Sequence, residues 1–270
     1  MKRKITILTI AFLSSMLMYA NAFAAATERC GDSIKWTLDD SGNLTLSGSG
    51  EMWNYGYVTS PFKDYGIKTV TIEYGITSIG DYVFRGCCGM TELTLPNSVT
   101  SIGDCAFYGC TGLTELILPN SVRSIGDIAF TYCSGLEKIT VESGNSCYDS
   151  RDNCNSIIDT EFNTLIVGCK NSVIPNSVTS IGYYAFYGCS GLTELTLPDS
   201  VASIGDGAFI CCSDLSKITS LAEIPPVCGR GVFDRVNKTN CELIVPIVSV
   251  TAYKQAEVWN EFSNIRAFPE

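Results

Sequence analysis

The side chains of this protein that could carry out chemistry are fourteen cysteines and a set of regularly spaced acidic residues, because histidine is absent altogether. Without histidine the chain cannot hold a Ser-His-Asp or Cys-His nucleophilic site, a zinc ion bound by imidazole, or an imidazole pH switch. Thiol chemistry and acid–base catalysis by paired carboxylates remain. The spacing of the cysteines and carboxylates therefore decides which chemistry to expect.

Five cysteines recur at steps of 23, 23, 56 and 23 residues. A free cysteine behaves as a small buried apolar side chain, and a position repeated at such a step meets the same surroundings each time. We therefore expect a structural ladder of buried thiols. Disulfides between neighbouring repeats are the alternative, because exported chains meet oxidising conditions. The ladder consists of Cys87, Cys110, Cys133, Cys189 and Cys212.

Nine further cysteines lie outside this ladder. Any disulfides are expected among these nine, and the sequence alone leaves their pairing open. They are Cys30, Cys88, Cys105, Cys147, Cys154, Cys169, Cys211, Cys228 and Cys241.

The cysteine ladder belongs to a repeat of 23 residues. The stretch "TELTLPNSVTSIGDCAFYGC" at 91–110 returns as "TELILPNSVRSIGDIAFTYC" at 114–133 and as "TELTLPDSVASIGDGAFICC" at 193–212. A period of this length is typical of solenoids and lies in the range of leucine-rich repeats. The alternation in L-x-L predicts a short strand with one buried face, which the following proline ends.

We therefore predict a repeat solenoid. Its expected form is a leucine-rich repeat right-handed coil with parallel β-strands on one face, short helical or 3₁₀ turns on the other, a β-rich N-terminal cap and a helical C-terminal cap. Stacked strands lie about 4.8 Å apart, so each inward Leu, Ile, Val, Ala or Phe rests on its own copy in the next coil. This packing explains the near-identity of the repeats without any catalytic demand.

The first 26 residues predict a secretory signal peptide. Three basic residues precede an almost wholly apolar run, and A-x-A cleavage options follow after Ala24 or Ala26. An uncleaved membrane anchor is the alternative. We expect a secreted or cell-surface protein with no membrane span after cleavage. Cleavage takes the net charge from −10 to −13, and an acidic chain without a basic patch is a poor partner for nucleic acid.

Residues 27–66 and 241–270 lack the repeat and are expected to cap the solenoid, which spans residues 67–240. In the first cap, "IKWTLDDSGNLTL" predicts two strands joined by a turn. In the second cap, a strand precedes a segment with helical spacing of its apolar residues. The residues with helical spacing are Tyr253, Ala256, Trp259 and Phe262. The side chains expected to cover the terminal coils are Trp36, Leu44 and Leu46 at one end, and Trp259 and Phe262 at the other.

An irregular insertion interrupts the repeat at about residues 142–171. Its "NSIIDTEFNTLIVGC" predicts a hairpin. Insertions in repeat proteins form loops, often on a binding face, and a solvated decoration is the alternative. Asp149 and Asp152 could attract calcium, but their spacing matches no EF-hand. We expect no metal and no cofactor.

The repeat "LTELTLPNSVTSIGDCAFYGCTG" resembles the bacterial surface leucine-rich repeats of the BspA-like, treponemal type. Their pattern is L-x-x-I-x-L-P-x-x-V-x-x-I-G-x-x-A-F-x-x-C, and the resemblance covers about residues 67–218 apart from the insertion. The resemblance implies a secreted or surface-displayed bacterial protein that adheres to host matrix proteins or cells. Its motifs specify the fold rather than the partner. The matching positions of one repeat are Leu93, Leu95, Pro96, Val99, Ile102, Gly103, Ala106, Phe107 and Cys110.

The surface expected to bind a partner is the outward face of the L-x-L strands, since a solenoid offers an extended surface of repeated side chains. This face is rich in hydroxyls and carboxylates, which suits a host extracellular-matrix or cell-surface protein, or a glycan. A structural scaffold without binding of its own is the alternative. The candidate residues are Glu92, Thr94, Glu115, Ile117, Lys138, Thr140, Glu194 and Thr196.

A glycoside hydrolase is a minor alternative. Glu92 and Glu115 on adjacent coils could lie about 5 Å apart, near the separation of a retaining pair. Such a pair is a by-product of repetition, and an open surface offers no pocket to raise one pKa. We therefore expect no enzyme.

Overall fold

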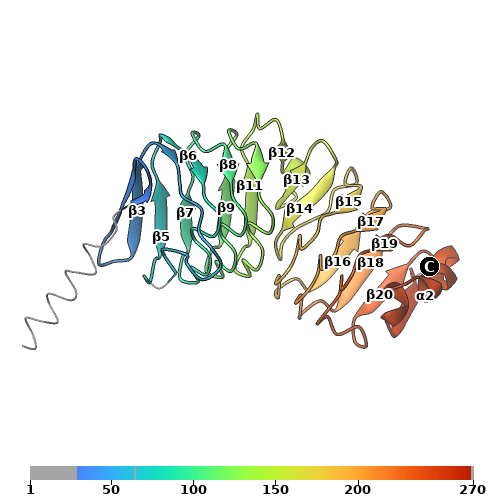
Figure 1. Cartoon of the computed structure of the whole chain (residues 1–270). Coiled ribbons are helices and arrows are strands. Elements are labelled where there is room, and N and C mark those ends of the chain that lie inside the picture. Colours follow the sequence, from blue (N-terminus) through green and yellow to red (C-terminus); the bar gives the residue numbers. More distant parts are fainter. Residues whose placement is uncertain (1–28, 64, 269–270) are drawn as a thin grey trace, which may run out of the picture.

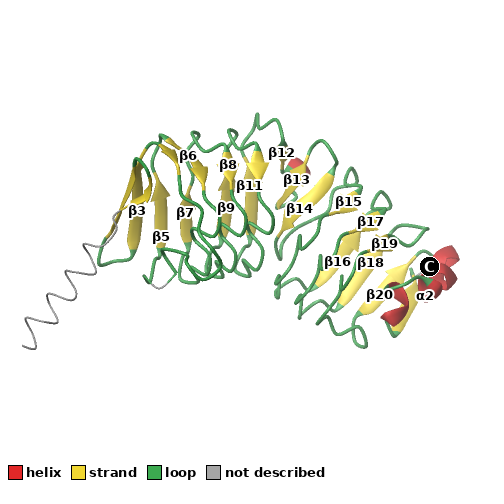
Figure 2. Cartoon of the chain, in the orientation of Figure 1, coloured by secondary structure: helices red, strands yellow, loops and turns green. Residues whose placement is uncertain are grey.

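The computed structural model describes residues 29–63 and 65–268, which form a curved stack of coils (Figure 1). Each regular coil has two short strands followed by a segment of turns. Within the described residues strands and turns dominate, and helix is confined to short pieces at the insertion and near the C-terminus (Figure 2). The predicted signal peptide, residues 1–26, lies outside the described residues.

The L-x-L strands form one face of the stack, which we call the strand face. Its strands run parallel from β3 onward, and within each sheet neighbouring parallel strands pair in register. Three sheets make up this face, in the orders β1-β2-β3-β5-β7, β9-β11 and β16-β18-β20-β21. The strands are β1 (Arg29–Gly31), β2 (Ile34–Leu38), β3 (Asn43–Gly48), β5 (Thr69–Ile72), β7 (Glu92–Thr94), β9 (Glu115–Leu118), β11 (Lys138–Val141), β16 (Glu194–Leu197), β18 (Lys217–Ser220), β20 (Glu242–Val245) and β21 (Asn264–Ala267).

The second strand of each coil belongs to two further sheets, in the orders β4-β6-β8-β10 and β12-β13-β14-β15-β17-β19. These strands contain the Ser-Ile pairs of the repeat, and Ser101 pairs with Ser124 in the next coil. They are β4 (Gly50–Glu51), β6 (Ile76–Ile79), β8 (Ser101–Ile102), β10 (Ser124–Ile125), β12 (Tyr148–Asp149), β13 (Ser156–Asp159), β14 (Thr164–Gly168), β15 (Ser180–Ile181), β17 (Ser203–Ile204) and β19 (Val227–Cys228).

The segments that follow the second strands form the third side of each coil, which we call the turn side. Their N–H groups alternate between two kinds of acceptor. Phe107 N donates to Ala129 O of the next coil, whereas Tyr108 N donates to Cys105 O three residues back. Cys105 and Gly109 have φ angles of 52° and 74°, and such left-handed residues end a helical turn. The expected short helical turns are therefore tight turns that never extend into a helix.

A stack of phenylalanine rings fills the core behind the turn side. Phe84, Phe107 and Phe130 lie parallel, with ring centroids 5.2 Å apart at each step. Phe186 and Phe209 continue the pattern in the second half, 5.0 Å apart. The core accordingly consists of two clusters, one in each half of the stack. The break between them coincides with the insertion.

The insertion is built into the stack, so the alternative of a solvated decoration was wrong. The predicted hairpin is confirmed, because β13 and β14 pair antiparallel. Ile157 is buried in the first core cluster, and Leu165 is buried in the second. The insertion also contains β12 and the 3₁₀ turn η1 (Arg151–Asn153). The hairpin therefore joins the two halves (Figure 1).

The two ends of the stack are closed differently. At the N-terminal end β2 and β3 form the predicted antiparallel hairpin, and Trp36 packs edge-on against Phe62. At the C-terminal end the expected single helix is broken into η2 (Ile247–Ser249), α2 (Val250–Gln255) and η3 (Trp259–Glu261). Trp259 and Phe262 nevertheless seal the last coil, since both rings contact Phe233.

Candidate functional site

The predicted binding residues all lie on the strand face with their side chains exposed or half-exposed. β7 presents Glu92 and Thr94, and both are exposed. Register pairing places Lys138 beside Glu115 and Thr140 beside Ile117, and Ile117 is 47% exposed. Glu194 and Thr196 are exposed in the same way on β16, beyond the insertion. The structure thus brings the candidates on β7, β9 and β11 together, whereas Glu194 and Thr196 on β16 are separated from them by the insertion.

The strand face is less acidic than its glutamates suggest, because cations from the next coil compensate three of them, Glu115, Glu194 and Glu242. Lys138 Nζ lies 2.6 Å from Glu115 Oε1, and Lys217 Nζ lies 2.9 Å from Glu194 Oε2. Arg266 pairs with Glu242 in the last coil. Exposed pairs of this kind contribute only about 0–1 kcal/mol to stability. Their main effect is to turn an expected acidic face into a face of alternating charge.

Glu115 is therefore unsuited to act in a carboxylate pair with Glu92, because Lys138 already occupies one of its oxygens. Asp149, which the sequence offered as a calcium ligand, is likewise bound through both carboxylate oxygens by Arg151. Among residues 29–63 and 65–268 no group of three potential ligand side chains is placed to hold a metal ion. In the same residues no helix is long and apolar enough to cross a membrane.

A hollow on the strand face was not predicted from the sequence. It lies where the sheet is interrupted between β11 and β16, and its wall includes Glu194 and Thr196. Val173 and Leu221 also line this hollow and are exposed. The irregular fourth repeat unit could have indicated this hollow. A repeat that lacks its L-x-L strand leaves the strand of the next coil without a neighbour.

The cysteines of the ladder are buried side chains in the core. Cys110 Sγ donates to Phe84 O, Cys133 Sγ to Phe107 O and Cys212 Sγ to Phe186 O, each over 3.2 Å. These three are thiols, as are the nine cysteines outside the ladder. Burial raises the pKa of Cys133 and Cys212 to about 12. A thiol of that pKa is neither a nucleophile nor a metal ligand at neutral pH.

The free energy of unfolding is expected to fall as the pH rises from 8 to 10. An unfolded cysteine ionises near pH 9.0, whereas folded Cys133 keeps its proton up to about pH 12. Above pH 9 the unfolded state therefore holds fewer protons, and each such thiol lowers stability by about 1.4 kcal/mol at pH 10. Urea unfolding at both pH values measures the fall. In Cys133→Ala the fall should be about 1.4 kcal/mol smaller, and equal falls in the two proteins would contradict this account.

Comparison with protein families gives one match. The model described as "BspA type Leucine rich repeat region", in six copies, matches residues 59–164 and 155–234. These residues make up more than half of the chain, and they include the strand face from β5 to β18 and the insertion. No curated protein matches the chain.

Solved structures of repeat proteins are similar to the chain. A leucine-rich repeat protein from Eubacterium ventriosum is 26% identical over 80% of this chain and 70% of that one, with a TM-score of 0.49. A leucine rich cell surface protein from Faecalibacterium prausnitzii is 18% identical over 91% of this chain and 96% of that one, with a TM-score of 0.49. The pneumococcal vaccine antigen PcpA is 15% identical over 83% and 84%, again with a TM-score of 0.49.

Proposed function

Because the chain belongs to the BspA-type leucine-rich repeat family, we propose that it is a secreted or cell-surface protein that binds another macromolecule through its strand face. The partner is a host extracellular-matrix or cell-surface protein, or a glycan. Export would use residues 1–26 as a signal peptide. Membership of a family of bacterial surface repeats points to protein interaction or adhesion and not to catalysis.

The observation that carries the proposal is the composition of the strand face at its centre. Ile117 is an exposed apolar side chain on β9, with Thr140 beside it and the Glu115–Lys138 ion pair two residues away. An apolar contact ringed by polar groups is the arrangement of a protein interface, in which the centre carries most of the affinity. The parallel ladder fixes these side chains in place before binding, which reduces the entropy lost on association.

Alternating charge on the strand face favours a partner that carries both signs of charge. Glu115 and Lys138 can exchange their mutual ion pair for pairs with the partner, because both side chains are about half exposed. Rim charges of this kind mainly determine specificity and the association rate. A scaffold without binding of its own remains the second candidate, supported by the ion pairs that already satisfy these charges within the chain.

We expect the Ile117→Arg variant to weaken binding at least about tenfold, since it places an unpaired charge at the interface centre. The measurement is saturable binding of the full chain to immobilised matrix proteins, mucins and cell-surface glycoproteins. The matched control is Ala202→Arg, which adds the same charge at an exposed site just before β17 on the other sheet. Equal affinity of both variants and the wild type would overturn the strand-face proposal, and absence of any saturable binding would favour the scaffold.

A further inference from the structure

The turn side carries a run of tyrosines that crosses the break between the two halves of the stack. We call it the tyrosine belt, and neither the repeat pattern nor the family match accounts for it. Several of its rings are exposed, among them Tyr57 and Tyr183, with exposed fractions of 63% and 45%. The belt consists of Tyr57, Tyr82, Tyr108, Tyr132, Tyr183, Tyr184 and Tyr187.

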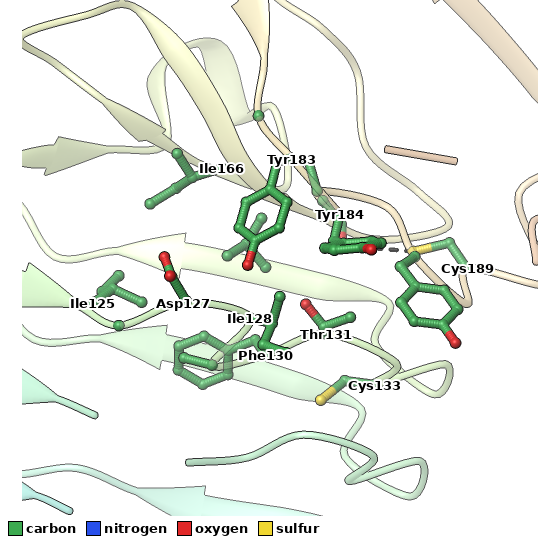
Figure 3. A pocket seen from close by; sticks show the side chains of 17 residues that line it. Ile125, Asp127, Ile128, Phe130, Thr131, Cys133, Ile166, Tyr183, Tyr184 and Cys189 are labelled. Atoms are coloured by element: carbon green, nitrogen blue, oxygen red, sulfur yellow. Dashed lines mark hydrogen bonds between the residues drawn. The ribbon is translucent and has the colours of Figure 1, made fainter. Parts of the chain in front are cut away.

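Two adjoining hollows lie along the belt. A crevice of about 140 Å³ opens between the coils, where Tyr183 and Tyr184 of one coil face Asp127, Ile128 and Thr131 of the other (Figure 3). A second hollow of about 250 Å³ continues from it toward Tyr57 and Tyr82. The two share the side chains of Ile128, Thr131, Tyr184 and Tyr187.

The crevice exists because the coils separate at the insertion. In regular coils a phenylalanine N–H donates to the alanine carbonyl of the next coil, as Phe107 does to Ala129 and Phe186 does to Ala208. At the break the donor to Ala185 O is instead Gly168 N, from the hairpin. Gly168 is required there, because a Cβ would lie 2.2 Å from the ring of Phe186. The hairpin thus holds the crevice open as a permanent feature of the fold.

The rings of the belt are held in place by contacts with one another and with one arginine. Centroid distances are 4.7 Å for Tyr183–Tyr184, 5.6 Å for Tyr184–Tyr187 and 5.5 Å for Tyr132–Tyr187. The Arg85 guanidinium lies 3.5 Å from the Tyr57 ring centroid, and its Nη1 donates to Tyr57 O. A surface whose aromatic side chains are already ordered loses little entropy on binding.

Polar groups along the belt can both donate and accept hydrogen bonds. Burial raises the pKa of Tyr108 to about 12, so its hydroxyl stays protonated. Burial also raises the pKa of Tyr183, and the nearby charge of Asp127 adds to the rise. Asp104 and Asp127 are exposed. Asp104 Oδ1 accepts a hydrogen bond from Asp127 N of the next coil, as Asp81 Oδ1 does from Asp104 N. The carboxylates of Asp104 and Asp127 can therefore still accept hydrogen bonds from a ligand.

We propose that the tyrosine belt is a second binding site, separate from the strand face, and that its ligand is an uncharged oligosaccharide. A pyranose ring has an apolar C–H face that stacks on tyrosine, and hydroxyls that donate to the carboxylates of Asp104 and Asp127. Tyrosine suits such a ligand because its ring is apolar and its tip is polar. A chain of sugar rings matches a chain of aromatic rings.

Two other ligands fit the belt less well. An anionic ligand would meet the like charges of Asp104 and Asp127, and Arg85 is buried, only 8% exposed. A proline-rich peptide also stacks on aromatic grooves, but it offers carbonyl acceptors where the rim carboxylates need donors. Both ligands are suitable as competing probes.

The test is titration calorimetry of the full chain with cellohexaose, maltohexaose, mannohexaose and N-acetylchitohexaose, with hexagalacturonate and a proline decamer in parallel. At least one neutral hexaose should bind. Tyr183→Ala combined with Tyr57→Ala should weaken that binding about tenfold or more, whereas Tyr183→Phe keeps the stacking ring and most of the affinity. Tyr74→Ala is the matched control, since Tyr74 is exposed and outside the belt. A far-UV spectrum and melting temperature like those of the wild type show that the variants fold.

Each possible result of the titrations either supports or overturns the proposal. A neutral hexaose that binds the wild type and Tyr74→Ala but not the double variant supports the proposal. Failure of all four neutral hexaoses overturns it, as does tighter binding of hexagalacturonate or of the proline decamer. Ile117→Arg on the strand face should bind the hexaose normally, so the two binding surfaces can fail independently.

Discussion

Replacing Gly103 with alanine is expected to lower the free energy of unfolding by about 3 kcal/mol or more. A Cβ at this position would lie 2.7 Å from the backbone N of Asp81 and 2.8 Å from the backbone C of Gly80, both in the preceding coil. Backbone atoms cannot move aside as a flexible side chain can. Relief would require the two coils to separate, which would break the hydrogen bond from Asp104 N to Asp81 Oδ1. Gly126 meets the same contacts one coil later, at 2.6 Å from Asp104 N.

Urea unfolding followed by far-UV circular dichroism measures this effect. Gly56→Ala is the matched control, because its Cβ would have only an ordinary contact, 3.4 Å from Thr59 Oγ1. The control should change stability by about 0.5 kcal/mol or less. If Gly103→Ala were as stable as the control, the close approach of the coils at this glycine would be wrong.

Phe107→Ala is expected to lower the free energy of unfolding by about 3–5 kcal/mol. The ring is fully buried and lies between Phe84 and Phe130, 5.2 Å from each centroid. Truncation removes contacts on both ring faces and leaves a cavity that neighbours held by ladder hydrogen bonds cannot fill. The same unfolding measurement applies.

Phe162→Ala removes an equal side chain from the tip of the insertion hairpin, where Phe162 is 65% exposed. It should change stability by about 0.5 kcal/mol or less. Similar losses in the two variants would show that the phenylalanine stack contributes no more than an exposed ring does.

The period of 23 residues was sufficient to predict the stacked coils. A slot that recurs at one step must hold a side chain that packs on its own copy, so the spacing of Phe84, Phe107 and Phe130 alone places them in one column. Alternation likewise predicted the hairpin in the insertion, because Ile157 and Val167 needed a buried face. These predictions depended only on local pattern and on neighbours that repeat it.

Predictions failed where the chain departs from its own repeat. Helical spacing suggested one helix through Tyr253 and Phe262, but Ala256 is extended and Val258 has a φ of 69°. The chain must bend there because Trp259 packs on Phe233 and β21 returns to pair with β20. Contacts with residues far apart in sequence override the local pattern in this segment.

The candidate site was predicted in part. Alternation correctly identified the outward side chains of the strand face, yet the pairing of Glu115 with Lys138 was missed although the two stand 23 residues apart. The tyrosine belt could not be found in this way. Tyr132 and Tyr187 belong to units separated by the irregular insertion, and only the geometry of the break brings them together.

The most direct test of the two-surface account compares one strand-face variant with one belt variant on the same ligands. Ile117→Arg and the double variant of Tyr57 and Tyr183 would be titrated in parallel against the protein partner from the adhesion assay and the neutral hexaose from calorimetry. The account predicts that Ile117→Arg loses the protein and keeps the hexaose, while the belt variant does the reverse. The account would be contradicted if either variant lost both ligands, or if both variants kept both ligands.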